Sequence, residues 1–197
     1  MEPGRELWVE VRRKSLLLGL AVSYFGWGFI TVVGAALTSM VRFLPYGRAL
    51  ESAVWVFLVA VGGAVVSTLE FLVSFPARWG SGPKGRDASL LALLSVVSWF
   101  MLMQLPSFFS DYLAPTIFVV CMSVGNAMNH AYSKLFKAPG HKTQLLVSAL
   151  LALSSPIPLI LSPLGSAFSW TVSTVLVGAE YIGVANYLYS KAFRSGG

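Results

Sequence analysis

Two carboxylates lie inside long apolar runs, where an ionisable side chain is unusual. Glu180 lies within the run 166–190 and Glu70 within the run 49–76. An ionisable residue inside a membrane-spanning segment is costly, and it usually faces a bundle interior or a water-filled cavity. Glu180 lies ten residues before Ser190, about 15 Å from the end of its run at 1.5 Å per helical residue. A carboxylate at such depth can hold a proton or a cation.

A stripe of polar residues marks a third apolar run, 113–133. Its members recur every three or four residues, so they share one helical face. They are Ser123, Asn126, Asn129, His130 and Ser133. Amide and imidazole groups can coordinate a polar solute or relay protons. Alternatively, they only join neighbouring helices through hydrogen bonds.

The carboxylates and the stripe together predict one binding site in a polar cavity facing the cytoplasm. On the last apolar run, Tyr187 shares a helical face with Glu180. The predicted binding residues are Glu180, Glu70, Asn126, Asn129, His130 and Tyr187.

Residue patterns typical of membrane enzymes are missing from the sequence. Cys121 is the single cysteine, Asp87 and Asp111 are the only aspartates, and no His-Glu-x-x-His pattern occurs. The sequence therefore predicts no catalytic residue and no metal-ligand set, and it identifies no cofactor. A non-enzymatic role is favoured.

The composition shows which kind of protein must position these side chains. Of 197 residues, 56% are hydrophobic and 11% are charged, and the mean hydropathy is +0.73. Soluble domains carry about 25% charged residues. The chain is therefore predicted to be an all-α integral membrane protein.

Six apolar runs are long enough to be membrane-spanning helices, which need about 20 residues to cross about 30 Å of hydrocarbon. The runs are continuous rather than alternating, which argues against the strands of a barrel. The predicted spans are 15–41, 49–76, 88–105, 113–133, 143–163 and 166–190. They are joined by short loops into a six-helix bundle.

The basic residues predict the orientation of this bundle. All Lys and Arg residues except Arg42 and Arg48 fall at the two ends of the chain or in the second and fourth connections. Those twelve are Arg5, Arg12, Arg13, Lys14, Arg78, Lys84, Arg86, Lys134, Lys137, Lys142, Lys191 and Arg194. The positive-inside rule then places both termini in the cytoplasm. We expect a cytoplasmic interfacial segment over 1–14, one transmembrane domain over 15–190 and a cytoplasmic tail over 191–197.

The net charge of +6 has the same origin. Basic residues beside membrane ends favour anionic lipid headgroups as partners, not nucleic acid. The loop 79–86 is both basic and glycine-rich. Either it binds an anion or it is an ordinary cytoplasmic turn.

Prolines interrupt the fifth predicted span. Pro156 and Pro158 follow Ser154-Ser155 at mid-depth, and each proline removes a backbone donor and disfavours helix at the residue before it. The fifth helix is therefore predicted to be kinked or broken there. Broken helices supply backbone groups to transporter binding sites. Alternatively, the helix ends early in an external re-entrant segment.

Three functions are compatible with these features. The first is a small multi-pass transporter, channel or substrate-binding transport subunit of the cell membrane, acting on a small solute or ion. The second is a non-catalytic subunit that scaffolds a larger membrane complex, with a second copy or another membrane protein as partner. The third is a lipid-modifying enzyme that uses Glu70 and His130.

Overall fold

The computed structural model describes residues 3–41, 44–78, 86–136 and 142–194, and every element in these ranges is helical. The all-α prediction is therefore confirmed for this part of the chain. The chain forms two compact units. The first unit comprises Met1–Ser81 and Tyr181–Gly197, and the second comprises Gly82–Glu180. The last helix contributes to both. The basic loop 79–86 lies outside the described residues except for Arg86.

Helix α1 (Pro3–Val41) is the longest element of the first unit, with 39 residues. At 1.5 Å per residue it measures about 58 Å, far more than the hydrocarbon core of a bilayer requires. It runs without a break through the boundary expected at residue 14, because nothing in Arg12-Arg13-Lys14 opposes helix formation. Glu10 and Lys14, one turn apart, form an ion pair of 2.7 Å there.

The second predicted span consists of three consecutive helical segments. Helix α2 (Gly47–Phe57) continues into the π-helical η1 (Leu58–Gly62), which continues into α3 (Gly63–Arg78). A π-helical turn widens the helix locally, and such turns are frequent at functional sites.

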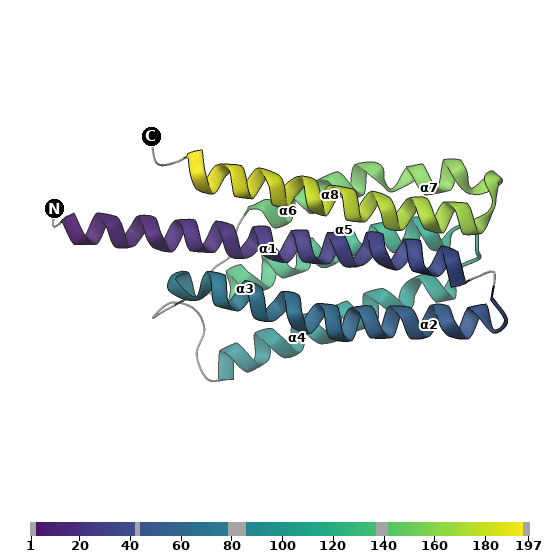
Figure 1. Ribbon diagram of the computed structural model, residues 1–197, viewed down its shortest axis with the longest axis horizontal. Coiled ribbons are helices and arrows are strands. Elements are labelled where there is room, and N and C mark those ends of the chain that lie inside the picture. The colour runs from purple at the N-terminus through teal and green to yellow at the C-terminus, as the bar shows by residue number, and fades with distance from the viewer. Residues whose placement is uncertain (1–2, 42–43, 79–85, 137–141, 195–197) are drawn as a thin grey trace. The chain divides into compact units, whose positions relative to one another are not determined.

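Glycines of α1 allow this composite helix to pack closely against it. The two run antiparallel (Figure 1). A Cβ atom added to any of three glycines would overlap the facing helix, so the absence of a side chain permits the approach. These glycines and the residues they face are Gly19 with Ser74, Gly26 with Val66, and Gly34 with Trp55.

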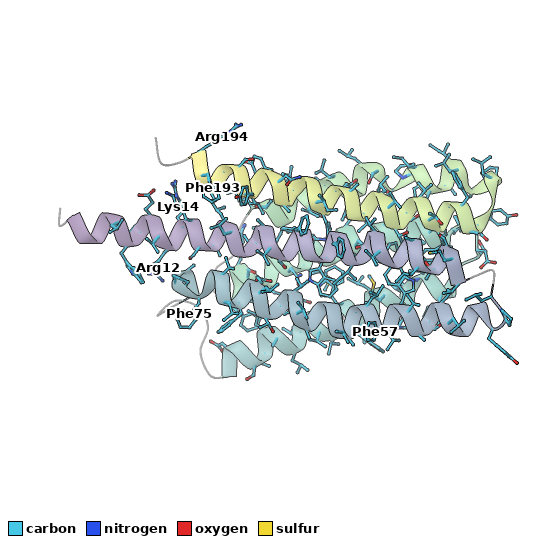
Figure 2. All side chains as sticks on the ribbon, in the orientation of Figure 1. Arg12, Lys14, Phe57, Phe75, Phe193 and Arg194 are labelled. Atoms are coloured by element: carbon cyan, nitrogen blue, oxygen red, sulfur yellow. The ribbon has the colours of Figure 1, made fainter. Side chains whose placement is uncertain are left out.

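The cytoplasmic end predicted for this pair carries one further contact. Arg12 donates a hydrogen bond of 3.3 Å to the carbonyl oxygen of Ala77 near the end of α3. Figure 2 shows Arg12 and Lys14 on opposite sides of α1. The Arg12 side chain therefore ties the extension of α1 to the last turn of α3.

The second unit begins with α4 (Arg86–Gln104), the 3-10 segment η2 (Leu105–Phe108) and α5 (Ala114–Leu135). Gly125 of α5 lies against the ring of Trp99 of α4. The hydroxyls of Ser98 and Tyr132 are 2.8 Å apart. These contacts hold α4 and α5 together.

The predicted interruption of the fifth span is present. One residue, Ser155, separates helix α6 (Thr143–Ser154) from α7 (Pro156–Leu161). The 3-10 segment η3 (Ser162–Leu164) then leads to α8 (Ser166–Arg194). Gly165 has a φ of 116°, which favours glycine at this turn. The hydroxyl of Ser169 donates a hydrogen bond of 2.7 Å to the carbonyl of Pro158.

Five helical stretches in the described residues are long and apolar enough to cross a membrane. They are Leu7–Val41, Leu50–Ala77, Ser89–Phe108, Thr143–Leu164 and Ser166–Arg194. A multi-pass membrane protein is therefore supported. The remaining predicted span corresponds to α5, which has 22 residues but is less apolar, because Asn126, Asn129 and His130 lower its mean hydropathy.

Candidate functional site

Glu180 is the central residue of α8 (Ser166–Arg194) and the last residue of the second unit. Its carboxylate lies beside the hydroxyl of Ser154, and this hydroxyl donates a hydrogen bond of 3.2 Å to the carbonyl of Leu151. The second carboxylate oxygen, Oε2, is buried and has no hydrogen-bond partner. The structure therefore places an incompletely satisfied carboxylate beside the last residue of α6.

Two backbone carbonyls near the end of α6 accept no hydrogen bond from a backbone N–H four residues further along the chain. Pro156 has no N–H for the carbonyl of Ala152, which instead accepts a hydrogen bond of 2.8 Å from the Ser155 hydroxyl. Pro158 likewise offers no N–H to the carbonyl of Ser154. The carbonyl end of a helix carries partial negative charge.

The polar stripe of α5 is partly engaged in structural hydrogen bonds. Ser123 donates a hydrogen bond of 2.7 Å to the carbonyl of Ser148 on α6. The buried amide of Asn126 donates one of 2.8 Å to the carbonyl of Met122, and Ser133 donates one of 2.8 Å to the carbonyl of Asn129. The Ser123–Ser148 bond joins α5 to α6 and matches the alternative in which the stripe holds helices together, whereas the other two bonds lie within α5.

The stripe and Glu180 lie on different sides of the Ser123–Ser148 contact. Ser154, which neighbours Glu180, is six residues past Ser148 on α6, about 9 Å along that helix. Because α5 and α6 run antiparallel, Asn126, Asn129 and His130 lie on the other side of Ser123. A site shared by the carboxylate and these residues stays a prediction.

His130 is the least satisfied residue of the stripe. Its side chain is 8% exposed, and both ring nitrogens are buried without a hydrogen-bond partner. The same holds for Oε1 of Gln144 on α6. Relative to the Ser123–Ser148 contact, both residues lie toward the same end of the antiparallel pair, His130 two turns and Gln144 one turn away. Sequence reasoning missed Gln144, although its four-residue spacing from Ser148 places both on one face.

Replacing His130 with leucine tests whether this imidazole has a structural role. Because an unpartnered buried polar group destabilises a fold, His130→Leu should raise the free energy of unfolding by about 1 kcal/mol. Denaturant unfolding in detergent micelles measures it. Asn126→Leu is the matched control and should be destabilising, because it removes a bonded amide. Equal destabilisation by both variants would show that His130 has a partner that stabilises the fold.

Glu70 belongs to the first unit. The hydroxyl of the fully buried Ser74 donates a hydrogen bond of 2.7 Å to the backbone carbonyl of Glu70. The carboxylate of Glu70 is close enough to act electrostatically on the hydroxyl of Tyr24. Tyr24 packs edge-to-face on Tyr181, with centroids 5.4 Å apart. The sequence analysis missed both tyrosines, although each is a polar group inside an apolar run.

Tyr187 also belongs to the first unit, where 51% of its side chain is exposed. The ammonium group of Lys191 lies 5.7 Å from its ring centroid, one turn further along α8. This geometry is that of a cation–π pair. A role for Tyr187 in binding stays a prediction.

The predicted residues thus form two groups. Glu180, Asn126, Asn129 and His130 belong to the second unit, whereas Glu70 and Tyr187 belong to the first. A single cavity containing all six stays a prediction. The chain matches no protein family model, and its comparison with curated proteins and with solved structures finds no significant similarity.

Proposed function

We propose that the protein is a six-span transporter, channel or substrate-binding transport subunit of the cell membrane, with both termini in the cytoplasm, and that it binds a small solute or ion at Glu180. One observation carries this proposal. Glu180 lies at the centre of a membrane-length helix, beside an interrupted helix, with one buried carboxylate oxygen unpartnered.

A sixth span formed by α5 is compatible with its length and burial. Its 22 residues extend about 33 Å, enough to cross the hydrocarbon. The polar residues that lower its hydropathy include the buried Ser123, Asn126 and His130. Since these side chains are covered by protein, the helix does not expose them to lipid. Six spans then place the basic residues mainly on the cytoplasmic side.

Binding accounts best for the state of Glu180. An unsatisfied buried carboxylate is costly in a membrane protein, and such residues mark solute and ion pathways. Interrupted helices at mid-membrane supply carbonyl groups to transporter sites. In this chain Ser154, the last residue of α6 before the interruption at Ser155, lies beside the Glu180 carboxylate. A purely structural carboxylate would be expected to have both oxygens satisfied.

The scaffold hypothesis is the second candidate, and the stripe of α5 favours it. The Ser123–Ser148 hydrogen bond and the bonded amide of Asn126 show that part of the stripe joins helices or stabilises α5 itself. A scaffold would leave Glu180 without a ligand, and it would copurify with a stoichiometric partner in mild detergent.

The proposal is tested on the purified protein in two steps. A thermal-shift screen with Na⁺, K⁺, Mg²⁺, amino acids, sugars and nucleosides identifies compounds that stabilise the wild type. Uptake of the labelled hit into proteoliposomes then compares the wild type with Glu180→Gln. We expect the thermal shift and the uptake to be lost in this variant at unchanged expression.

The matched control is Glu51→Gln in α2, a carboxylate near the other end of a predicted span, which should behave as the wild type. Uptake by Glu180→Gln at the wild-type rate would contradict the proposal. A screen without any stabilising compound, together with a stoichiometric copurified partner, would support the scaffold instead.

A further inference from the structure

We propose that the ion bound at Glu180 is a proton, held on the buried oxygen Oε2, and that the site therefore couples the protein to proton binding. This inference rests on the proposed function, because it names the ion used at the same site. It is carried by the geometry around Glu180 in the second unit.

The first argument concerns the space around Oε2 of Glu180. Oε2 of Glu180 is buried within the protein and has no hydrogen-bond partner. A metal cation would need space beside this oxygen, and the neighbouring side chains would have to move apart. A proton needs no such space, because it forms an O–H bond within the contact distance of the oxygen itself.

The second step is the set of possible ligands. Hard cations such as Ca²⁺ and Mg²⁺ require about six or more oxygen ligands, whereas among the described residues no side chain other than Ser154 acts on the Glu180 carboxylate. In the ranges that the structure describes, no group of three or more His, Cys, Asp or Glu side chains could hold a metal ion. The surroundings of Glu180 thus suit protonation better than metal coordination.

The third step is the charge. Helices α6 and α7 contain no ionisable residue, and the segment of α8 before Glu180 contains none. The ionisable residues of α5 are Cys121, His130, Tyr132 and Lys134, and α4 has Arg86 and Asp87 in its first turn. Tyr181 follows Glu180 on α8.

None of these groups pairs with the unpartnered oxygen. Lys134 is exposed in the last turn of α5. A buried carboxylate without a counter-charge is strongly disfavoured and becomes neutral by taking up a proton. The reaction is the transfer of one proton from hydronium to Oε2, which converts the carboxylate to a carboxylic acid and leaves water.

Infrared difference spectroscopy of the purified protein during a pH titration tests the proposal. A protonated carboxylic acid has a C=O stretching band that the carboxylate lacks. We expect such a band in the wild type, its complete loss in Glu180→Gln, and its retention in Glu70→Gln. Glu180→Asp keeps a carboxyl group and should show the band at a shifted frequency. This variant tests the assignment even if Glu180→Gln does not fold.

Two results would overturn the assignment. One is a band that persists in Glu180→Gln, or that is lost only in Glu70→Gln. The other is removal of the band by NaCl or KCl at constant pH, with choline chloride as the control, because a competing metal cation would then occupy the site. Proteoliposome uptake separates the two proposals. A Glu180-dependent band without any uptake would refute transport alone, and Glu180-dependent uptake without a band would refute the proton alone.

Discussion

Replacing Gly19 with alanine should lower the free energy of unfolding by about 2–3 kcal/mol, because added volume in a tightly packed interface strains both helices. A Cβ atom at this position would lie 2.6 Å from Cβ of Ser74 and 3.3 Å from both the Ser74 Cα atom and the Glu70 carbonyl oxygen. Two of these atoms belong to the backbone, so no side-chain rotation relieves the overlap. Helices α1 and α3 would have to separate.

The matched control is Gly183→Ala on α8. No atom lies within 4 Å of a Cβ built there, and alanine is the better helix former by about 1 kcal/mol. We therefore expect Gly183→Ala to be neutral or stabilising. Denaturant unfolding in micelles compares both variants with the wild type. Equal losses at the two positions would show that close packing at Gly19 is not what stabilises the first unit.

Gly34 provides an intermediate case that sharpens the comparison. A Cβ there would overlap the outer ring atoms of Trp55, which can rotate aside. Gly34→Ala should therefore destabilise less than Gly19→Ala. The order of the three alanine variants, rather than any single value, tests whether backbone contact determines the cost.

Replacing Glu180 with leucine should stabilise the fold while abolishing solute and proton binding. Oε2 of Glu180 is a buried polar atom without a partner, and leaving such a group unsatisfied costs about 1–3 kcal/mol, which an apolar side chain of similar size avoids. Because Glu180 is only partly buried, we expect about 1–2 kcal/mol here. The combination of greater stability and lost binding is typical of residues kept for function.

Unfolding and thermal-shift measurements on Glu180→Leu check both parts of this prediction. Ser154→Ala is the control, because it removes the hydroxyl beside the carboxylate and leaves Glu180 itself in place, so it should not raise stability. Marked destabilisation by Glu180→Leu would mean that the carboxylate has a stabilising partner, and the case for a binding role would then fail.

Much of the helical architecture was predictable from the sequence because hydropathy and helical periodicity are local properties. The apolar runs correspond to the long helices, and the spacing of Asn126, Asn129 and His130 placed them on one helix. The break before Pro156 followed from the chemistry of proline. Glu180 stood out because an ionisable residue is rare in an apolar run.

Other features depended on contacts between helices and could not be predicted. The π-helical turn Leu58–Gly62 has no signal in its apolar residues. The packing of Tyr24 on Tyr181 joins residues far apart in the chain. Gln144 could be recognised as a candidate site residue only from the structure. The Ser123–Ser148 hydrogen bond aligns α5 with α6, and it places Gln144 toward the same end of this helix pair as His130. Oε1 of Gln144 is buried there without a hydrogen-bond partner.

The sequence by itself determined that this is an all-helical, multi-pass membrane protein with a carboxylate deep in its last helix, since length, hydropathy and charge act residue by residue. Only the tertiary structure decided which polar atoms are satisfied. Ser123 found a partner on α6, whereas Oε2 of Glu180 and the ring nitrogens of His130 found none. Satisfaction of a buried polar atom depends on the helix that faces it, and that neighbour is set by packing across the fold.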